Sequence, residues 1–281
     1  MSPAGRDVSV VIPVWDHFVE RFLPEALASI RTQDLEARIV IVDNASSPPV
    51  AAPDRVKVVR APERLTLGAA RNLALNTIPT PFVVFWDADD VMLPGTLSAM
   101  RRRLEGTANA VAVATAMVEA PGVLHHWPRR ASRALAPRRT LFALVHAVSS
   151  QFPTIGAAMI RTETARDAGG FADADAGEDW VLGVSLAFRG RILFDEHAGR
   201  LYRQWSGTIS SHSGAAEFAR RAGSVRRRLR SDPAVPAWIR ALGPALLAPQ
   251  LFVIYVLRPL RLLMRPSARG GLALHSGLGD V

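Results

Sequence analysis

The chain has 281 residues, of which 49% are apolar and 21% are charged, and its formal net charge is +9. This balance excludes an intrinsically disordered chain, because disordered sequences have too few apolar residues to bury. The absence of cysteine excludes disulfides, thiolate zinc sites and cysteine nucleophiles. The first fourteen residues contain Asp7 and no long apolar run before a cleavage site. We therefore expect a cytoplasmic chain without a secretory signal.

The positive charge belongs to the C-terminal third. The chain up to Val184 has 19 basic and 20 acidic residues, whereas the remainder has 15 basic and 5 acidic residues. The first part therefore has the charge balance of an ordinary globular domain. Any interaction driven by positive charge is expected in the last third.

The N-terminal part alternates strand and helix patterns. Val8 to Val14 is a β-branched run without helical period, and Arg38 to Val42 and Val56 to Val59 are of the same type. Such continuous apolar runs predict buried parallel strands. Apolar residues at helical spacing from Phe22 to Ile30 predict a helix between the first two strands, which makes a right-handed βαβ unit.

The same alternation continues along the chain. Leu67 to Leu75 predicts a helix, Phe82 to Trp86 a fourth buried strand, Pro94 to Leu104 a helix and Ala108 to Val118 another strand. Repeated strand and helix patterns predict a doubly wound α/β fold with a Rossmann-like, mostly parallel sheet. In such a sheet the ligand lies at the carboxyl ends of the strands.

The middle of the chain is less regular. Residues 122–139 show no clear periodicity, and there is no internal repeat. After this stretch we predict strands at Thr154 to Ile160, Arg191 to Phe194 and Arg200 to Trp205, and helices at Thr162 to Ala168 and Glu178 to Phe188.

Three carboxylates directly follow the fourth strand. Asp87, Asp89 and Asp90 form a D-x-D pattern behind a fully apolar segment, at the edge where an open α/β sheet binds ligands. Such a cluster repels itself and favours a cation, and an oxygen-only site favours Mg²⁺ or Mn²⁺. The alternative is a solvated turn that caps the helix after Pro94.

Five motifs in order resemble the family-2 glycosyltransferases of the GT-A fold. They are VSVVIPV at 8–14, IVIVDNAS at 39–46, GAARNLAL at 68–75, FWDADD at 85–90, and GGF with GEDW at 169–180. The resemblance covers roughly Val8 to Ser210, and five ordered motifs are more specific than any single one. It implies metal-assisted transfer of a sugar from a nucleoside diphosphate donor, usually with inversion at the anomeric carbon.

The resemblance also assigns roles in the donor site. Pro13 and Val14 match the end of the first strand that lies against the nucleobase, and Asp43 matches a carboxylate that accepts a hydrogen bond from the base. Arg71 and Asn72 match a helix beside the nucleotide and diphosphate. For Asp43 the alternative is a cap of its own loop, and for Arg71 it is a surface arginine.

The remaining assignments concern the sugar, the metal and the acceptor. Asp87 matches the ribose or sugar contact, Asp89 the metal ligand, and Asp179 the general base, with Glu178 beside it. The alternative for Glu178 and Asp179 is that they only cap the following helix. The family's usual histidine after a Tyr-Arg segment is missing at its expected place, so His212 is the nearest candidate for a metal or phosphate contact.

The C-terminal third combines arginines with an apolar run. Residues 241–257 carry no charge but contain two prolines and are too short for a clean membrane span. Three interpretations remain open: attachment in the plane of the inner membrane surface, packing on the catalytic domain, and a dimer interface. We divide the chain into a catalytic domain over 1–212, a basic and apolar helical extension over 213–266, and a flexible tail over 267–281.

Two other functions compete with sugar transfer. A sugar-phosphate nucleotidyltransferase shares the sheet architecture, but it normally has a glycine-rich, basic phosphate loop after the first strand, where this chain has VWDHFVERF. A nucleic-acid-binding protein would use the arginines from Arg220 to Arg230, yet few aromatic residues accompany them. We expect no nucleic-acid partner and a nucleotide-sugar donor. The acceptor, whether a glycan, a lipid-linked molecule or a small molecule, is left open by the sequence.

Overall fold

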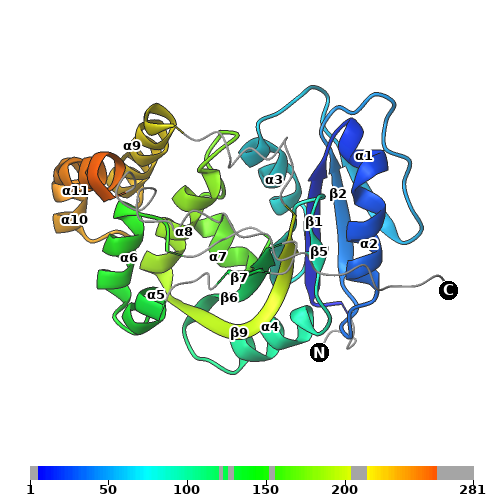
Figure 1. Ribbon diagram of the computed structural model, residues 1–281, viewed down its shortest axis with the longest axis horizontal. Coiled ribbons are helices and arrows are strands. Elements are labelled where there is room, and N and C mark those ends of the chain that lie inside the picture. Colours follow the sequence, from blue (N-terminus) through cyan, green and yellow to red (C-terminus); the bar gives the residue numbers. More distant parts are fainter. Residues whose placement is uncertain (1–5, 120–122, 126–129, 152–155, 204–213, 258–281) are drawn as a thin grey trace, which may run out of the picture.

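The computed structural model describes residues 6–119, 123–125, 130–151, 156–203 and 214–257. These residues form one nine-stranded sheet in the order β3-β2-β1-β4-β8-β6-β9-β5, with β7 paired to β6 (Figure 1). The strands are β1 (Val8–Val14), β2 (Arg38–Asp43), β3 (Val56–Arg60), β4 (Phe82–Phe85), β5 (Val91–Met92), β6 (Ala110–Glu119), β7 (Val123–His125), β8 (Ala158–Arg161) and β9 (Arg191–Tyr202).

Helices lie on both faces of this sheet. Those that precede the C-terminal third are α1 (His17–Arg21), α2 (Leu23–Arg31), α3 (Leu67–Leu75), α4 (Thr96–Glu105), α5 (Arg130–Leu135), α6 (Arg139–Val148), α7 (Thr162–Asp167) and α8 (Glu178–Arg189). The sheet is mostly parallel, since β3, β2, β1 and β4 run in one direction, and β6 and β9 pair in parallel. The α/β architecture predicted from the sequence is confirmed.

Alternation along the strands builds two separate cores. In β4, Val84 faces α2 and α4, whereas Val83 and Phe85 face the helices α3, α7 and α8. Successive side chains of a strand point to opposite faces, so a strand that is covered on both sides must be apolar throughout. This explains why the strands read as unbroken apolar runs.

The order of the strands indicates where a ligand is expected. The chain builds β1, β2 and β3 outward in one direction and then returns to add β4 on the other side of β1. In open α/β sheets such a reversal marks the ligand crevice, at the carboxyl ends of the two strands where the following loops diverge. The residues after Val14 and Phe85 therefore border the expected donor site.

The irregular middle differs from the prediction in two places. The strands predicted at 191–194 and 200–205 form one strand, β9, which extends as far as Tyr202, and Trp205 lies outside the described residues. Polar residues interrupt the apolar pattern of β9, but β6 pairs along its length through several register shifts. Such bulges keep an irregular sequence in the sheet. The stretch without periodicity ends in α5, and α6 follows directly.

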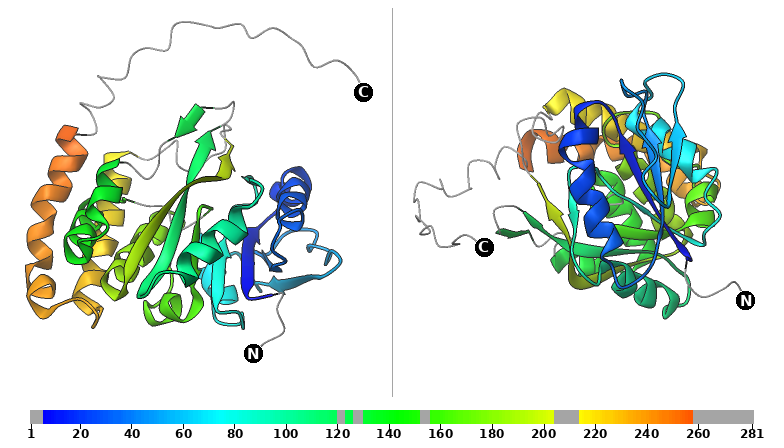
Figure 2. Two further views of the ribbon diagram at one scale, coloured as in Figure 1. Left: turned by 90° about the horizontal axis from the view of Figure 1, so that it is seen from below. Right: turned by 90° about the vertical axis from the view of Figure 1, so that its right-hand side faces the viewer.

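The C-terminal third continues as helices that pack on the rest of the chain. They are α9 (Ala215–Ser231), α10 (Ala237–Leu242), the 3₁₀ turn η2 (Gly243–Leu246), α11 (Leu247–Phe252) and the π-helical turn η3 (Val253–Leu257). In both Figure 1 and Figure 2 these helices lie at the opposite end of the molecule from β1 and β2. None of the helices in the described ranges is long and apolar enough to cross a membrane.

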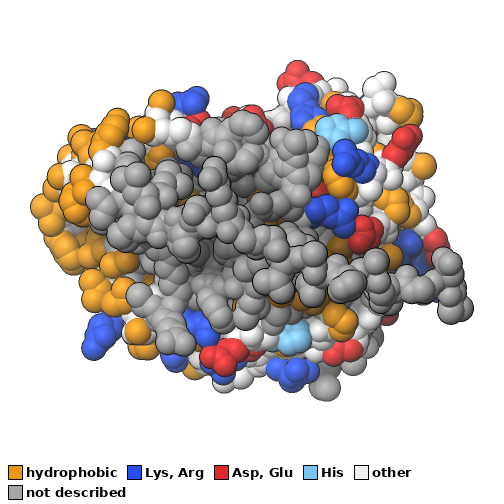
Figure 3. All heavy atoms as spheres, viewed as in Figure 1, with side chains coloured by type: hydrophobic (Ala, Val, Ile, Leu, Met, Phe, Trp, Pro, Cys, Tyr) orange, Lys and Arg blue, Asp and Glu red, His pale blue; other side chains and the backbone are white. Residues whose placement is uncertain are grey.

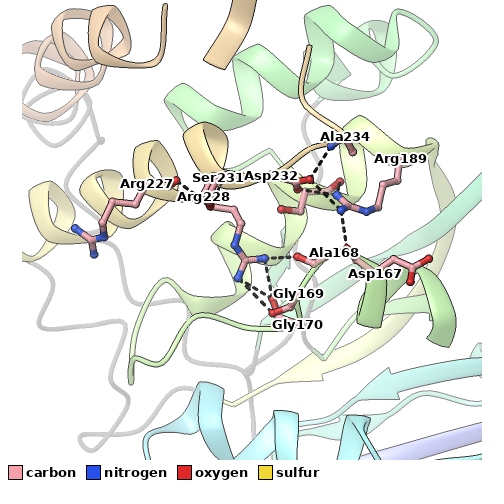
Figure 4. A network of polar contacts seen from close by, with 11 residues as sticks. Asp167, Ala168, Gly169, Gly170, Arg189, Arg227, Arg228, Ser231, Asp232 and Ala234 are labelled. Atoms are coloured by element: carbon pink, nitrogen blue, oxygen red, sulfur yellow. Dashed lines mark hydrogen bonds and ion pairs between the residues drawn. The ribbon is translucent and has the colours of Figure 1, made fainter. Parts of the chain in front are cut away.

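Arginines fasten α9 to the neighbouring helices. Arg228 donates to the carbonyl oxygens of Ala168, Gly169 and Gly170 at the end of α7, and Arg189 of α8 holds the Asp232 carboxylate with both terminal nitrogens, at 2.6 and 2.9 Å (Figure 4). Helix α9 also contributes Ala222, Val225 and Leu229 to the core that α8 faces. The helical extension predicted after residue 212 thus shares a core with the sheet. The division into domains remains a prediction.

Candidate active site

An unbroken series of ion pairs lies at the carboxyl end of β4, where the donor site is expected. Its members are Glu178, Arg71, Asp87, Arg200 and Asp90, in this order of contact. We call this series the carboxylate–arginine chain. It joins the acidic cluster after β4 to the acidic start of α8, although the two clusters are about ninety residues apart in the sequence. The structure therefore brings together Arg71, Asp87 and Glu178, three residues of the sequence motifs.

Arg71 links the two acidic clusters directly. Its Nη1 donates to Glu178 Oε1 at 2.6 Å, and its Nη2 donates to Asp87 Oδ1 at 2.9 Å. The side chain is 3% exposed, so the alternative of a surface arginine is wrong. Helix α3 can lie this close to the start of α8 because residue 68 is glycine: a Cβ there would lie 1.8 Å from the Ala172 carbonyl oxygen.

Arg200 is the functional residue that the sequence analysis missed. It extends from β9, and its Nη2 donates to Asp87 Oδ2 at 2.9 Å and pairs with Asp90. The turn before β8 leaves room for its guanidinium, since a Cβ at Gly156 would lie 2.2 Å from Arg200 Nη1. Burial alone would lower the pKa of Arg200, but Asp90 and Asp87 raise it above its ordinary value. The only sequence signal was an arginine inside a strand.

Asp90 is the last member of the carboxylate–arginine chain and is buried in the interior. Its side chain is 0% exposed and its Oδ1 accepts from the backbone N–H of Arg203 at 3.1 Å. Its backbone carbonyl accepts from Trp86 Nε1 at 3.2 Å. Asp90 therefore anchors Arg200 and the end of β4, and is out of reach of a ligand.

The first turn of α8 holds the other two carboxylates. Glu178 is 5% exposed, burial raises its pKa to about 7, and its Oε2 has no hydrogen-bond partner among the described residues. Asp179 is partly exposed, its Oδ1 accepts from the Trp180 N–H at 2.7 Å, and burial raises its pKa above the ordinary value of an aspartate. Gly177 begins the turn at φ 81°, a left-handed conformation that favours glycine.

The predicted donor-site residue Asp43 is engaged in local structure. Asp43 is 1% exposed; Oδ1 accepts from Ser46 N at 2.9 Å, Oδ2 accepts from Val50 N at 3.1 Å, and Arg60 pairs with Oδ2. This arrangement is the loop cap that the sequence left open as an alternative. Burial alone would raise the pKa of Asp43, but these hydrogen bonds outweigh that effect and lower it below the ordinary value. Contact with a base stays a prediction.

Asn72 and the end of β1 shape the walls of the crevice. The Asn72 amide pairs with the backbone of Phe171, accepting from its N–H at 2.9 Å and donating to its carbonyl at 3.0 Å. Pro13 and Val14 are buried at the end of β1, opposite Val42 and Asp43 of β2. They lie at the predicted edge of the crevice.

The acidic cluster after β4 offers part of a metal site. Asp89 is partly exposed, whereas both oxygens of Asp87 accept from arginines. The described residues contain no group of three histidine or carboxylate side chains that would hold a metal on their own. A divalent ion held by one or two carboxylates, water and substrate phosphate fits this donor set. His212 lies outside the described residues.

Comparisons with known proteins agree with this geometry. Residues 9–169, more than half of the chain, match the family model described as glycosyl transferase family 2. The uncharacterized protein MT1568 of Mycobacterium tuberculosis (strain CDC 1551 / Oshkosh) is 28% identical over 230 residues, which span 74% of this chain and 70% of that protein.

Solved structures show the same fold at low sequence identity. TarS 1-349 of S. aureus in complex with UDP-GlcNAc has a TM-score of 0.65 at 17% identity, covering 92% of this chain and 76% of that one. The mannosyltransferase PcManGT from Pyrobaculum calidifontis, in complex with GDP-Man and Mn2+, has a TM-score of 0.53 at 19% identity, with coverages of 91% and 80%. These matches confirm the predicted GT-A fold. Together with the family model, they show that the chain belongs to glycosyl transferase family 2 and is a glycosyltransferase.

Proposed function

We propose that the chain transfers a sugar from a nucleoside diphosphate donor to an acceptor hydroxyl with inversion, and that Asp179 is the general base. The observation that carries this proposal is the carboxylate–arginine chain. It links the acidic cluster after β4 to the acidic first turn of α8 through Arg71, so that both lie at the carboxyl end of β4. An inverting transfer requires two such groups of charges, one beside the leaving diphosphate and one beside the attacking hydroxyl.

Asp179 suits the role of base better than Glu178. The Glu178 side chain is 6% exposed and gives one oxygen to Arg71, whereas Asp179 is partly exposed at the mouth of the turn. Burial raises the pKa of Asp179, and a carboxylate with a raised pKa takes up a proton more readily. Glu178 fixes Arg71, and through it the position of Asp87.

The donor and the metal are inferred from both the site and the relatives. The comparison structures contain UDP-GlcNAc in one case and GDP-Man with Mn2+ in another, which supports a nucleotide-sugar donor and a divalent ion. Asp89, with its partly exposed carboxylate, would hold Mg²⁺ or Mn²⁺, and Asp87 faces the same crevice. When bound, such an ion neutralises charge on the leaving diphosphate.

Two substitutions separate the proposed roles. We expect Asp179→Asn to abolish transfer, because the amide cannot take the acceptor proton, while nucleotide binding by calorimetry is unchanged. We expect Asp89→Ala to remove the strengthening of nucleotide binding by Mn²⁺. Asp54→Asn, an exposed carboxylate far from the crevice, serves as the control.

The pH dependence of kcat/KM tests the assignment of the base independently. Because burial raises the pKa of Asp179, wild-type kcat/KM should fall on the acid side at a higher pH than for an aspartate with an ordinary pKa. Wild-type turnover of Asp179→Asn would show that another group is the base. A hydrolysis screen of UDP, GDP and dTDP sugars with Mn²⁺ identifies the donor for these measurements.

A further inference from the structure

The C-terminal helices present an apolar face to the surface. Eight large apolar side chains of the described residues are exposed, and seven of them lie in the segment from α10 to η3. They are Trp238, Leu242, Leu247, Leu251, Phe252, Tyr255 and Val256, with exposed fractions from 36% to 62%. We call them the apolar face. Figure 3 shows apolar side chains gathered at the end of the molecule that carries α10 and α11.

The helices that carry this face are fixed to the rest of the molecule. The exposed residues recur at spacings of four, as in Leu247, Leu251 and Tyr255, which places them on one side of a helix. The opposite side is packed: Ile239 belongs to the main core, and Gln250 donates to the Ala147 carbonyl oxygen of α6 at 2.9 Å. The apolar face is therefore exposed in the folded protein, on helices whose other side is packed.

An arginine-lined cavity adjoins the apolar face. Its volume is about 300 Å³, and Gly223, Arg226, Arg227, Arg230, Pro244 and Leu247 line it. Leu247 belongs to the cavity and to the apolar face, so the two are continuous. Residues 215–257 contain seven arginines against Glu217 and Asp232. Arg227 and Arg230 are exposed at the rim of the cavity.

We propose that the apolar face and the arginine-lined cavity together dock the protein on an anionic phospholipid bilayer. Helices with a strongly apolar side and a basic flank lie in the plane of such a membrane. The apolar face contains Trp238 and Tyr255, whose rings suit the boundary between headgroups and acyl chains. Three arginines line the adjoining cavity, and guanidinium groups are strong hydrogen-bond donors to the phosphate of a lipid headgroup.

The charges favour a membrane over a second copy of the chain. A two-fold dimer through this face would bring together two copies of the same positively charged surface, since such an interface pairs identical surfaces. Like charges at close range disfavour that contact, whereas anionic lipid neutralises them. The proposed partner of the excess positive charge in the C-terminal third is therefore anionic lipid.

The test is flotation of the full chain with phospholipid vesicles, a measurement that requires no sugar transfer. We expect the wild type to bind phosphatidylcholine vesicles that contain phosphatidylglycerol, to bind pure phosphatidylcholine weakly, and to dissociate partly at high salt. The double variant Leu251→Glu/Phe252→Glu should lower the vesicle-bound fraction at least about tenfold, because it places charge on the inserted face. Leu141→Glu, at an exposed leucine of α6, is the matched control and should bind like wild type.

A second pair of variants tests the cavity. Arg227→Glu/Arg230→Glu should abolish the preference for anionic vesicles, whereas Arg102→Glu/Arg103→Glu on α4 makes the same change of charge elsewhere and should retain it. Circular dichroism checks that each variant is folded. Wild type left unbound by anionic vesicles would overturn the proposal. The proposal would also be overturned if the Leu251/Phe252 variant bound vesicles as well as the wild type does. A third contrary outcome is a wild type that forms a dimer and binds no vesicles, when the Leu251/Phe252 variant is a monomer.

Discussion

Arg200 balances two carboxylates in the interior of the protein. Its side chain is 7% exposed and contacts both Asp87 and Asp90, the latter completely buried. Removing one partner of a buried ion pair is costly, because the remaining charge has lost both water and its counterion. Arg200 is thus a positioning residue that holds Asp87 towards the crevice.

We expect Arg200→Met to lower the free energy of unfolding by about 3–5 kcal/mol, measured by chemical denaturation. Arg220→Met removes an arginine whose side chain is 76% exposed and should cost less than about 1 kcal/mol. If the loss comes from an unpaired carboxylate, adding Asp90→Asn to Arg200→Met restores part of the stability. Equal effects of the Arg200 and Arg220 variants would contradict this account.

The sequence predicted most of the acidic residues of the site and missed the arginine between them. Asp87 and Glu178 belong to motifs with fixed local spacing, so their positions follow from the elements that carry them. Arg200 lies 113 residues after Asp87 and reaches it because β9 pairs with β6 and also with β5, where Arg200 is the register partner of Met92. Pairing between distant strands is set by the whole sheet, and a local pattern does not contain it.

At the scale of elements, a glycine turn holds α3 against the segment before α8. Gly170 has φ +60°, and a Cβ at this position would lie 2.3 Å from Asn72 Oδ1, the atom that accepts from the Phe171 N–H. The Phe171 ring packs edge-on against Phe85 with centroids 4.6 Å apart. The turn therefore connects α3, β4 and α7 at one point.

We expect Gly170→Ala to destabilise the protein by about 1–3 kcal/mol, because it adds backbone strain and disturbs the Asn72 hydrogen bonds. Gly223→Ala is the matched control: Gly223 lies inside α9, and a Cβ there would be 3.7 Å from its nearest neighbour, Arg227 Nη1, an ordinary contact distance. Alanine there should stabilise by up to about 1 kcal/mol. Thermal unfolding of both variants measures the contrast. A neutral Gly170→Ala would show that the turn tolerates a side chain.

Elements with a regular pattern were predicted well, and those set by tertiary contacts were not. Strands β1, β2 and β4 were recognised because burial on both faces makes them apolar along almost their whole length, and β3 was recognised by its three valines. The two-residue strand β5 escaped prediction, since it exists only through its pairing with β9. Helix α6 has a clear apolar side, but it follows a stretch of turn signals that obscured its start.

At the scale of the whole molecule, α9 belongs to the same core as the catalytic sheet. Leu229 is 0% exposed and lies in the hydrophobic cluster that contains Val83 of β4 and Val184 of α8. Arg228 also binds the carbonyl oxygens at the end of α7 (Figure 4). The chain up to η3 should therefore unfold as one unit.

We expect Leu229→Ala to lower the free energy of unfolding by about 2–5 kcal/mol, the usual cost of a cavity in a packed core. Hydrogen exchange should show that this loss appears equally in the amides of α9 and of β1, because both open in the same transition. Leu242→Ala, at a side chain that is 56% exposed, is the control and should have little effect. Loss of protection confined to α9 would instead indicate a separately unfolding extension.

The carboxylate–arginine chain also restricts how the sequence can change. Each inner member touches two neighbours of opposite charge: Arg71 lies between Glu178 and Asp87, and Asp87 lies between Arg71 and Arg200. Neutralising one member therefore removes a counterion from each of its buried neighbours. A substitution at any position of the series thus affects the stability of the adjacent members as well. The residues come from α3, α8, β9 and the segment after β4. Substitutions in any of these four segments are tolerated only if positive and negative side chains still alternate along the series.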